Sequence, residues 1–345
     1  MILIFLSLFI ILILFLQQWS LDSNLDVIEG DFFPDENVVD PDAWFDISIK
    51  LKNHRRFPLF YVKIQFPFSQ EFVVHETLML ATTKNGRNGH TVRLSTWLNS
   101  HEQTTLRIPV AISKRGRYLL SYPTVYLGDF LGLNEHGKDL EQFREVVVAP
   151  KEWDAAEVSQ VLGKFLGEYS VRRFLFEDPI LTLGYREYTG REPFKMISWK
   201  QSAQRQQLMV KEYDYTVEPV ISVLVNVETD LDSPGELLEK CFSLARSVCH
   251  TLESRGISYD FYTNAQITGG LGDDNTVNDG LGERHFLRVM ELLGRSMYTP
   301  SFSFSKLLEL AETAAGTEHG KIIITPDSVF FASDPQTLIL QANLL

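Results

Sequence analysis

The stretch that most restricts the fold of this chain is a nearly continuous apolar run at residues 219–227, PVISVLVNV. A strand that is buried on both faces has this composition, because helices cover both sides of a parallel sheet. Residues 234–255 follow with apolar side chains at helical spacing, and Gly256 stands in the position of a helix stop. The apolar positions of this predicted helix are Leu237, Cys241, Leu244, Ala245, Val248 and Leu252.

The same alternation of strand and helix continues to the C-terminus. Residues 257–262 and 321–325 have strand patterns, and residues 283–294 and 305–315 have helical patterns between them. Strands that alternate with helices predict an α/β domain over residues 219–345, built on a doubly wound and mostly parallel sheet.

The N-terminal part has a different pattern. Short segments such as 44–51 and 105–110 alternate apolar and polar residues, with turn residues between them. This spacing predicts an all-β sandwich over residues 26–150. Residues 151–181 have apolar side chains at helical spacing and are expected to form a helical connector.

The first 16 residues contain one polar side chain, Ser7, and no charged one, and the apolar character extends to Trp19. A stretch of about 16 to 19 residues is just long enough to cross the core of a bilayer, and tryptophan favours the interface. A secretory signal peptide would need a basic start and a small-residue cleavage site, and the sequence has neither. We therefore expect a transmembrane anchor at residues 1–19 and a single-pass protein of the cell membrane.

The two cysteines, Cys241 and Cys249, stand eight residues apart in one predicted helix. They would lie roughly 12 Å apart, which is too far for a disulfide. Buried thiols are typical of a reducing compartment, so we expect the bulk of the chain to be cytoplasmic.

The chain is acidic, with a formal net charge of −13 and a pI near 5.1. This excludes a general nucleic-acid-binding protein, which needs a basic surface to neutralise phosphates. Residues 219–345 hold 8 Lys and Arg against 17 Asp and Glu. Such acidity favours solubility or a basic protein partner.

Residues 182–213 combine more charged and aromatic residues than a connector needs. Four charged side chains are expected to form a polar cluster beside two aromatic ones. The charged residues are Arg186, Glu187, Lys200 and Glu212, and the aromatic ones are Tyr188 and Trp199. Two interpretations stay open: an ion-pair clasp between the two domains, or a site for a ligand or protein partner, since hot spots share this composition.

The same segment closely resembles the signature of the bacterial domain-of-unknown-function-58 family. The matching residues are Arg186, Tyr188, Gly190, Lys195, Ile197, Trp199, Lys200, Ser202, Ala203, Leu208, Val210 and Glu212. Two positions depart from the family, because Arg191 replaces an Asp and Gln204 replaces an Arg. Residues 114–118 and 128–133 are similar to two further family segments, R-R-G-x-Y and D-P-F-G-L.

The resemblance implies a von Willebrand factor type A-like fold for residues 219–345 and a MoxR-type AAA+ ATPase as partner. Domains of that fold often hold Mg²⁺ through D-x-S-x-S, which here reads Asn226-x-Glu228-x-Asp230. Because the hydroxyl ligands and the leading carboxylate are changed, we expect a degenerate site and no cofactor. Glu228, Asp230 and Asp327 remain the candidate ligands of a hard cation.

Together these features predict a membrane-tethered protein-binding adaptor or assembly factor, and not an enzyme. Two alternatives remain: a hydrolase that uses Glu187, Tyr188 and Lys200, and a purely structural envelope protein.

Overall fold

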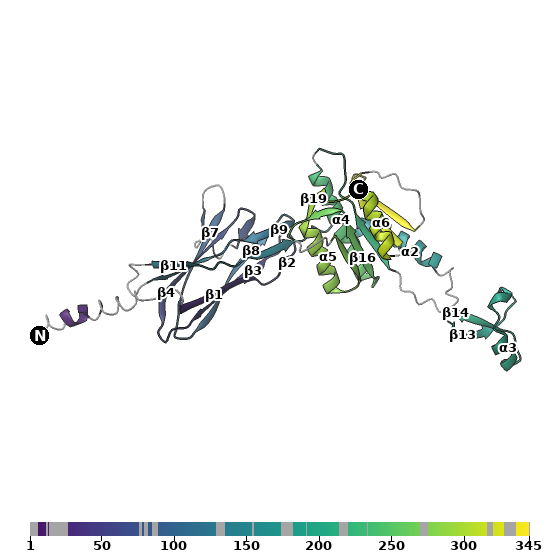
Figure 1. The fold of residues 1–345 in the computed structure, drawn as a ribbon, viewed down its shortest axis with the longest axis horizontal. Coiled ribbons are helices and arrows are strands. Elements are labelled where there is room, and N and C mark those ends of the chain that lie inside the picture. The colour runs from purple at the N-terminus through teal and green to yellow at the C-terminus, as the bar shows by residue number, and fades with distance from the viewer. Residues whose placement is uncertain are drawn as a thin grey trace. The chain divides into compact units, whose positions relative to one another are not determined.

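The computed structural model falls into two compact units. The first comprises Met1–Lys151 and Met290–Ser296, and the second comprises Glu152–Val289 and Met297–Leu345. Figure 1 colours the chain from its N-terminus to its C-terminus. The structure describes residues 6–11, 13, 27–75, 78, 82–84, 89–128, 135–153, 155–173, 182–190, 192–213, 220–232, 234–269, 275–315, 320–327 and 336–344.

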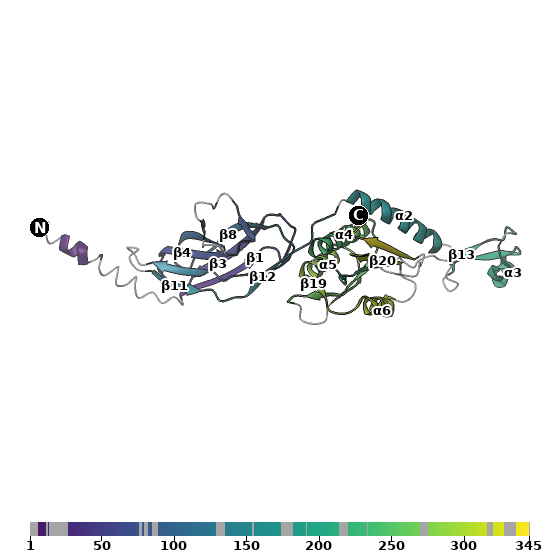
Figure 2. The same cartoon turned by 90° about the horizontal axis from the view of Figure 1, so that it is seen from above.

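Three sheets form the first unit. One has the order β1 (Ile28–Pro34), β3 (Phe45–Asn53), β8 (Gln103–Ile112) and β5 (Phe72–Val74). The second has the order β11 (Glu135–Asp139), β10 (Thr124–Gly128), β4 (Leu59–Phe68), β7 (His90–Leu98) and β6 (Thr82–Lys84). The third has the order β2 (Val38–Val39), β12 (Arg144–Val148) and β9 (Gly116–Leu120). The strands of this unit can be followed in Figure 2.

Strands in which buried and more exposed side chains alternate form the core of this unit. From Val62 to Phe68, alternate residues of β4 are buried, as expected for a strand with one face on a core. Phe32 of β1 meets Phe66 of β4 edge to face, with ring centroids 5.5 Å apart. Because these strands belong to different sheets, the contact joins the two sheets in one apolar core.

The second unit contains a sheet of order β18 (Thr276–Gly280), β16 (Tyr259–Thr263), β15 (Ile221–Val225), β20 (Gly320–Thr325) and β21 (Thr337–Gln341). β15 pairs in parallel with β16 and β20, β20 pairs in parallel with β21, and β18 is antiparallel. A further pair joins β17 (Ala265–Ile267) to β19 (Ser296–Pro300).

Helices cover this sheet on both faces. They are α2 (Ala155–Arg173), α4 (Gly235–Ser254), α5 (Glu283–Arg295) and α6 (Phe304–Ala315). In Figure 2, α2 and α4 lie above the sheet and α6 lies below it. All five residues of β15 are buried as a result, and Leu224 packs in one cluster with Leu307 of α6.

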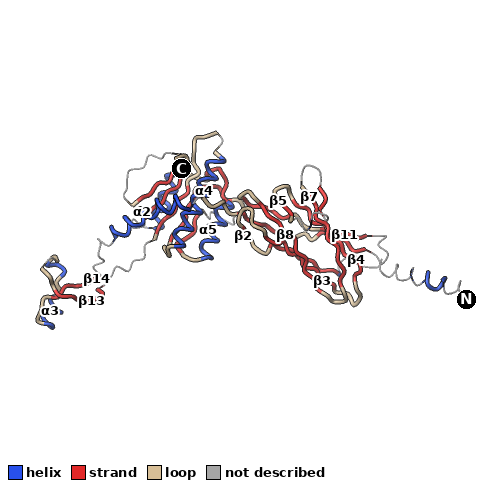
Figure 3. The backbone as a smooth tube through the Cα atoms, turned by 180° about the vertical axis from the view of Figure 1, so that it is seen from behind, coloured by secondary structure: helices blue, strands red, loops and turns tan. Residues whose placement is uncertain are grey.

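The expected fold class needs correction at the N-terminus. Strands hold 43% of the described residues and helices 28%, so β-structure dominates, as Figure 3 shows. Spanning a bilayer takes about 20 apolar helical residues, and no helix in the described ranges is long and apolar enough to do so. At the N-terminus, residues 6–11 and 13 are helical, while the rest of 1–19 lies outside the described residues. The predicted transmembrane anchor is therefore wrong, and the single-pass, cell-membrane localisation is withdrawn with it.

Candidate functional site

Residues 182–213, which we call the signature segment, form a small hairpin with an insertion. β13 (Thr182–Glu187) pairs antiparallel with β14 (Met209–Tyr213). Between them lie a 3₁₀ turn, η3 (Phe194–Met196), and a short helix, α3 (Trp199–Arg205). Figure 1 shows β13, β14 and α3 together. Gly190 has a φ of +86°, which explains glycine at this turn.

Ser202 ties the helix of the segment to its strand. Its Oγ donates to the Ser198 carbonyl at 2.8 Å and accepts the backbone N–H of Met209, also at 2.8 Å. The N–H of Ser198 in turn donates to the Met209 carbonyl at 2.8 Å. Buried polar groups need such partners, so the predicted site residue Ser202 has a structural role.

Glu192 organises the turn that follows β13. Its carboxylate accepts hydrogen bonds from Arg186 Nη1 at 2.5 Å, from Thr189 Oγ1 at 2.8 Å and from the Thr189 N–H at 3.1 Å. The bond from Arg186, followed by that from Thr189, lowers the pKa of Glu192 to about 2. Sequence reasoning missed Glu192, although the spacing Thr189-x-x-Glu192 is a capping-box pattern in which Glu reaches back to the first N–H.

The large apolar side chains of the segment face solvent. Phe194 is 73% exposed and Trp199 is 66% exposed. Leu208 and Tyr185 are exposed as well. Three apolar residues of the segment are buried: Ile197, Met209 and Val210.

The structure separates part of the predicted polar cluster. Arg186 pairs with Glu192, which lies outside the predicted cluster, and both Arg186 and Glu187 are exposed. Lys200 is exposed on α3. The ring centroids of Tyr188 and Phe194 lie 6.2 Å apart. The backbone of Glu212 pairs with Gly184, whereas its side chain, like the whole of Arg191, lies outside the described residues.

Two of the three candidate metal ligands at the carboxyl ends of β15 and β20 accept hydrogen bonds within the protein. Glu228 accepts the N–H of Phe304, the first residue of α6, at 2.6 Å. Asp327 accepts the hydroxyl of Thr229 at 2.5 Å. Asp230 is exposed. In the described part of the chain, no three His, Cys, Asp or Glu side chains are grouped to hold a metal ion.

Asn226 shows why the first position of the expected metal motif offers no ligand to Mg²⁺. Its Oδ1 accepts the N–H of Glu228 at 3.0 Å and Nδ2 of Asn264 at 2.8 Å. Its Nδ2 donates to the hydroxyl of Thr325 at 3.2 Å. Both oxygen lone pairs are used and the other end of the amide is a donor, so no ligand oxygen is left at the leading position.

The cysteines are structural. Cys241 and Cys249 are both buried and free. Burial, together with the charge of Asp327, raises the pKa of Cys241 to about 12, which leaves the thiol protonated and unreactive. His250 is exposed and its Nδ1 lies 2.7 Å from the Glu152 carboxylate, so it does not act with Cys249.

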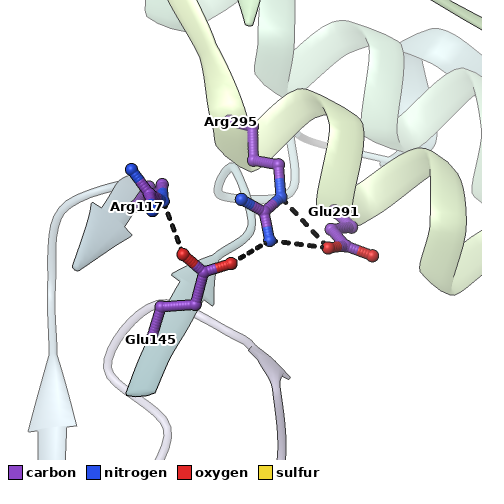
Figure 4. A network of polar contacts seen from close by, with 4 residues as sticks. All are labelled: Arg117, Glu145, Glu291 and Arg295. Atoms are coloured by element: carbon purple, nitrogen blue, oxygen red, sulfur yellow. Dashed lines mark hydrogen bonds and ion pairs between the residues drawn. The ribbon is translucent and has the colours of Figure 1, made fainter. Parts of the chain in front are cut away.

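A second group of arginines lies in the first unit, around the last turn of α5 (Figure 4). Arg117 Nε donates to Glu145 at 2.6 Å, and Arg295 Nη2 donates to the other oxygen of Glu145 at 2.5 Å. Arg295 also bonds Glu291 at 2.8 Å. Burial opposes ionisation of Glu145, but the two guanidiniums outweigh it and lower the pKa of Glu145. We call these four residues the Glu145 network.

Residues 114–118 also contact the end of α5. Arg115 Nη1 donates to the carbonyls of Leu293 and Ser296, each at 2.6 Å, and so caps the C-terminus of α5. The Tyr118 hydroxyl donates to the Lys114 carbonyl at 2.8 Å. Residues 128–133 are described only at Gly128, the last residue of β10.

No protein-family model and no curated protein matches this chain. Among solved structures, a cohesin module from a Clostridium perfringens family 33 glycoside hydrolase is 15% identical, covers 35% of this chain and 96% of its own, and has a TM-score of 0.27. The CARDB domain of the PF1109 protein from Pyrococcus furiosus is 14% identical over 36% of this chain and 97% of its own, with a TM-score of 0.23. Scores this low support no conclusion about fold or function, so the family resemblance rests on the sequence motifs.

Proposed function

We propose that this chain is a protein-binding adaptor and that the signature segment is its binding surface. The observation that carries the proposal is the exposure of two aromatic side chains, Phe194 at 73% and Trp199 at 66%. The backbone around them is held in place by the hydrogen bonds of Ser202. Leaving aromatic surface in water forgoes about 25 cal/mol per Å² of burial. A partner that covers these rings would recover that free energy.

The chemistry around the two rings supports the same conclusion. Binding hot spots are enriched in Trp, Tyr and Arg. Tyr185 and Arg186 are exposed on β13 of the same segment. Arg186 is held by Glu192 at 2.5 Å, so its side chain is ordered before a partner arrives and loses less conformational entropy on binding.

The family resemblance suggests the partner, a MoxR-type AAA+ ATPase to which the adaptor would present a client. Membrane tethering is no longer part of this function. The hydrolase alternative gains no support, because Glu187 and Lys200 are both exposed, whereas groups tuned for acid–base catalysis are held in positioned and partly desolvated sites.

The test uses the purified full chain and a MoxR-type ATPase from the same genome, with affinity measured by biolayer interferometry. Loss of a hot-spot side chain costs about 2 kcal/mol or more, so we expect Trp199→Ala to weaken binding about thirtyfold. Trp97→Ala is the matched control, because Trp97 is 68% exposed on β7, outside the segment. Equal losses from both variants, or none from Trp199→Ala, would refute the proposal.

A further inference from the structure

The signature segment is basic within an acidic chain. It holds six Lys and Arg against three Glu, a net charge of +3, while the whole chain carries −13. The remaining residues therefore carry −16. Most of that charge lies in residues 219–345, where 17 Asp and Glu face 8 Lys and Arg.

Two of the basic residues directly follow the exposed rings in the sequence. Lys195 follows Phe194 and Lys200 follows Trp199, and both lysines are exposed. Arg205, at the end of α3, is exposed too. The carboxylate of Glu192 accepts hydrogen bonds from Arg186 and Thr189.

Aromatic rings flanked by lysines fit an acidic protein surface that also offers apolar contacts. Duplex nucleic acid is the weaker choice, because its outer surface offers mainly phosphates and few apolar groups to cover the two rings. A second copy of this chain supplies an acidic surface at the same concentration as the basic one. Charge complementarity between the +3 segment of one copy and residues 219–345 of another, which hold 17 Asp and Glu against 8 Lys and Arg, therefore favours a self-partner.

We infer that the chain self-associates, with the signature segment of one copy bound to the acidic surface of another. This inference rests on the proposed function, since it uses the same binding surface. The contact joins two different surfaces and is therefore heterologous. A signature segment that is bound to a second copy cannot bind another partner, so self-association lowers the amount of adaptor that is available for binding.

Sedimentation velocity of the full chain tests the inference. At low salt, we expect the mass to rise above the 39.5 kDa of one chain as concentration increases. Salt should reverse this rise, because the screening length falls from about 10 Å at 0.1 M to about 3 Å at 1 M. Association through the exposed apolar residues Leu6, Leu8 and Phe9 would instead persist in salt and would overturn the inference.

Charge reversal identifies the surface. The double variant Lys195→Glu/Lys200→Glu should weaken self-association at least about tenfold, since each lysine loses an attraction and gains a repulsion. The matched control is Lys50→Glu/Lys52→Glu, which makes the same charge change at two exposed lysines of β3 and should leave association unchanged. A monomer at every concentration, or equal effects of the two double variants, would overturn the inference.

The outcome is separable from that of the proposed function. If the chain stays monomeric while Trp199→Ala still weakens ATPase binding, only the self-partner is refuted. A short DNA duplex that binds wild type but not the Lys195→Glu/Lys200→Glu variant, with no self-association, would assign the surface to nucleic acid and also overturn the inference.

Discussion

Two regions of this protein contain an arginine that is paired with a glutamate, and they differ in what surrounds the pair. Around the last turn of α5, the arginines are used within the fold. Arg115 caps the helix and Arg295, whose side chain is only 13% exposed, joins Glu145 to Glu291. In the signature segment, Trp199 faces solvent at 66% exposure. Composition does not separate a structural clasp from a binding surface, whereas the identity and burial of each partner do.

The reason lies in the cost of desolvation. A guanidinium that leaves water needs carboxylates or carbonyls in fixed positions, which the Glu145 network and the end of α5 provide. Removing one such partner leaves an uncompensated charge. An exposed aromatic ring needs no fixed polar partner within the fold, so its surface can bind another protein.

The largest effect is expected from Glu145→Ala. This change leaves Arg117 and Arg295 close together without their shared carboxylate. Breaking a buried pair costs about 3 to 5 kcal/mol, and the partial exposure of Glu145 places this case near the lower value, about 3 kcal/mol. Urea denaturation followed by circular dichroism measures it. Glu29→Ala is the control, because Glu29 is 69% exposed beside His54 and should matter by less than about 0.5 kcal/mol. Equal effects would remove the distinction between the two regions.

A smaller, local effect is expected from acid. The folded-state pKa of Glu192, about 2, lies below its ordinary value of 4.5. The stabilisation by its carboxylate is therefore fully present above the ordinary value and is lost as pH falls from there through the folded pKa. Carbon-13 NMR of the Glu192 carboxyl should show this low titration midpoint, and Arg186→Ala should move it upward. A midpoint at the ordinary value in the wild type would contradict the role of Arg186.

The smallest effect on stability is expected from Trp199→Ala. Because the ring is largely in solvent, the free energy of unfolding should change by less than about 0.5 kcal/mol. Val210→Ala, at a fully buried position of the same segment, should cost about 2 kcal/mol. Hydrogen exchange of the β13 and β14 amides compares the two. If Trp199→Ala proves as destabilising as Val210→Ala, the segment is a clasp between the domains after all.

Local pattern predicted several elements of this fold. The apolar run at 219–227 predicted a strand buried on both faces, and Ile221–Val225 is such a strand. The stripe with Cys241 and Leu252 predicted the helix that is α4, and both side chains are buried on it. These features depend on side-chain periodicity, which neighbouring residues carry by themselves.

Partners distant in the chain were decided by tertiary structure alone. Arg295 and Glu145 are 150 residues apart, and Thr229 and Asp327 are 98 apart, so no local pattern records either contact. The sequence alone also placed a transmembrane anchor at residues 1–19, which no described helix supports. The pairing of Arg186 with Glu192 also depends on the turn at Gly190, since the backbone path decides which carboxylate a guanidinium reaches. Periodicity determines which face of an element is apolar, and only the folded chain determines which polar groups meet.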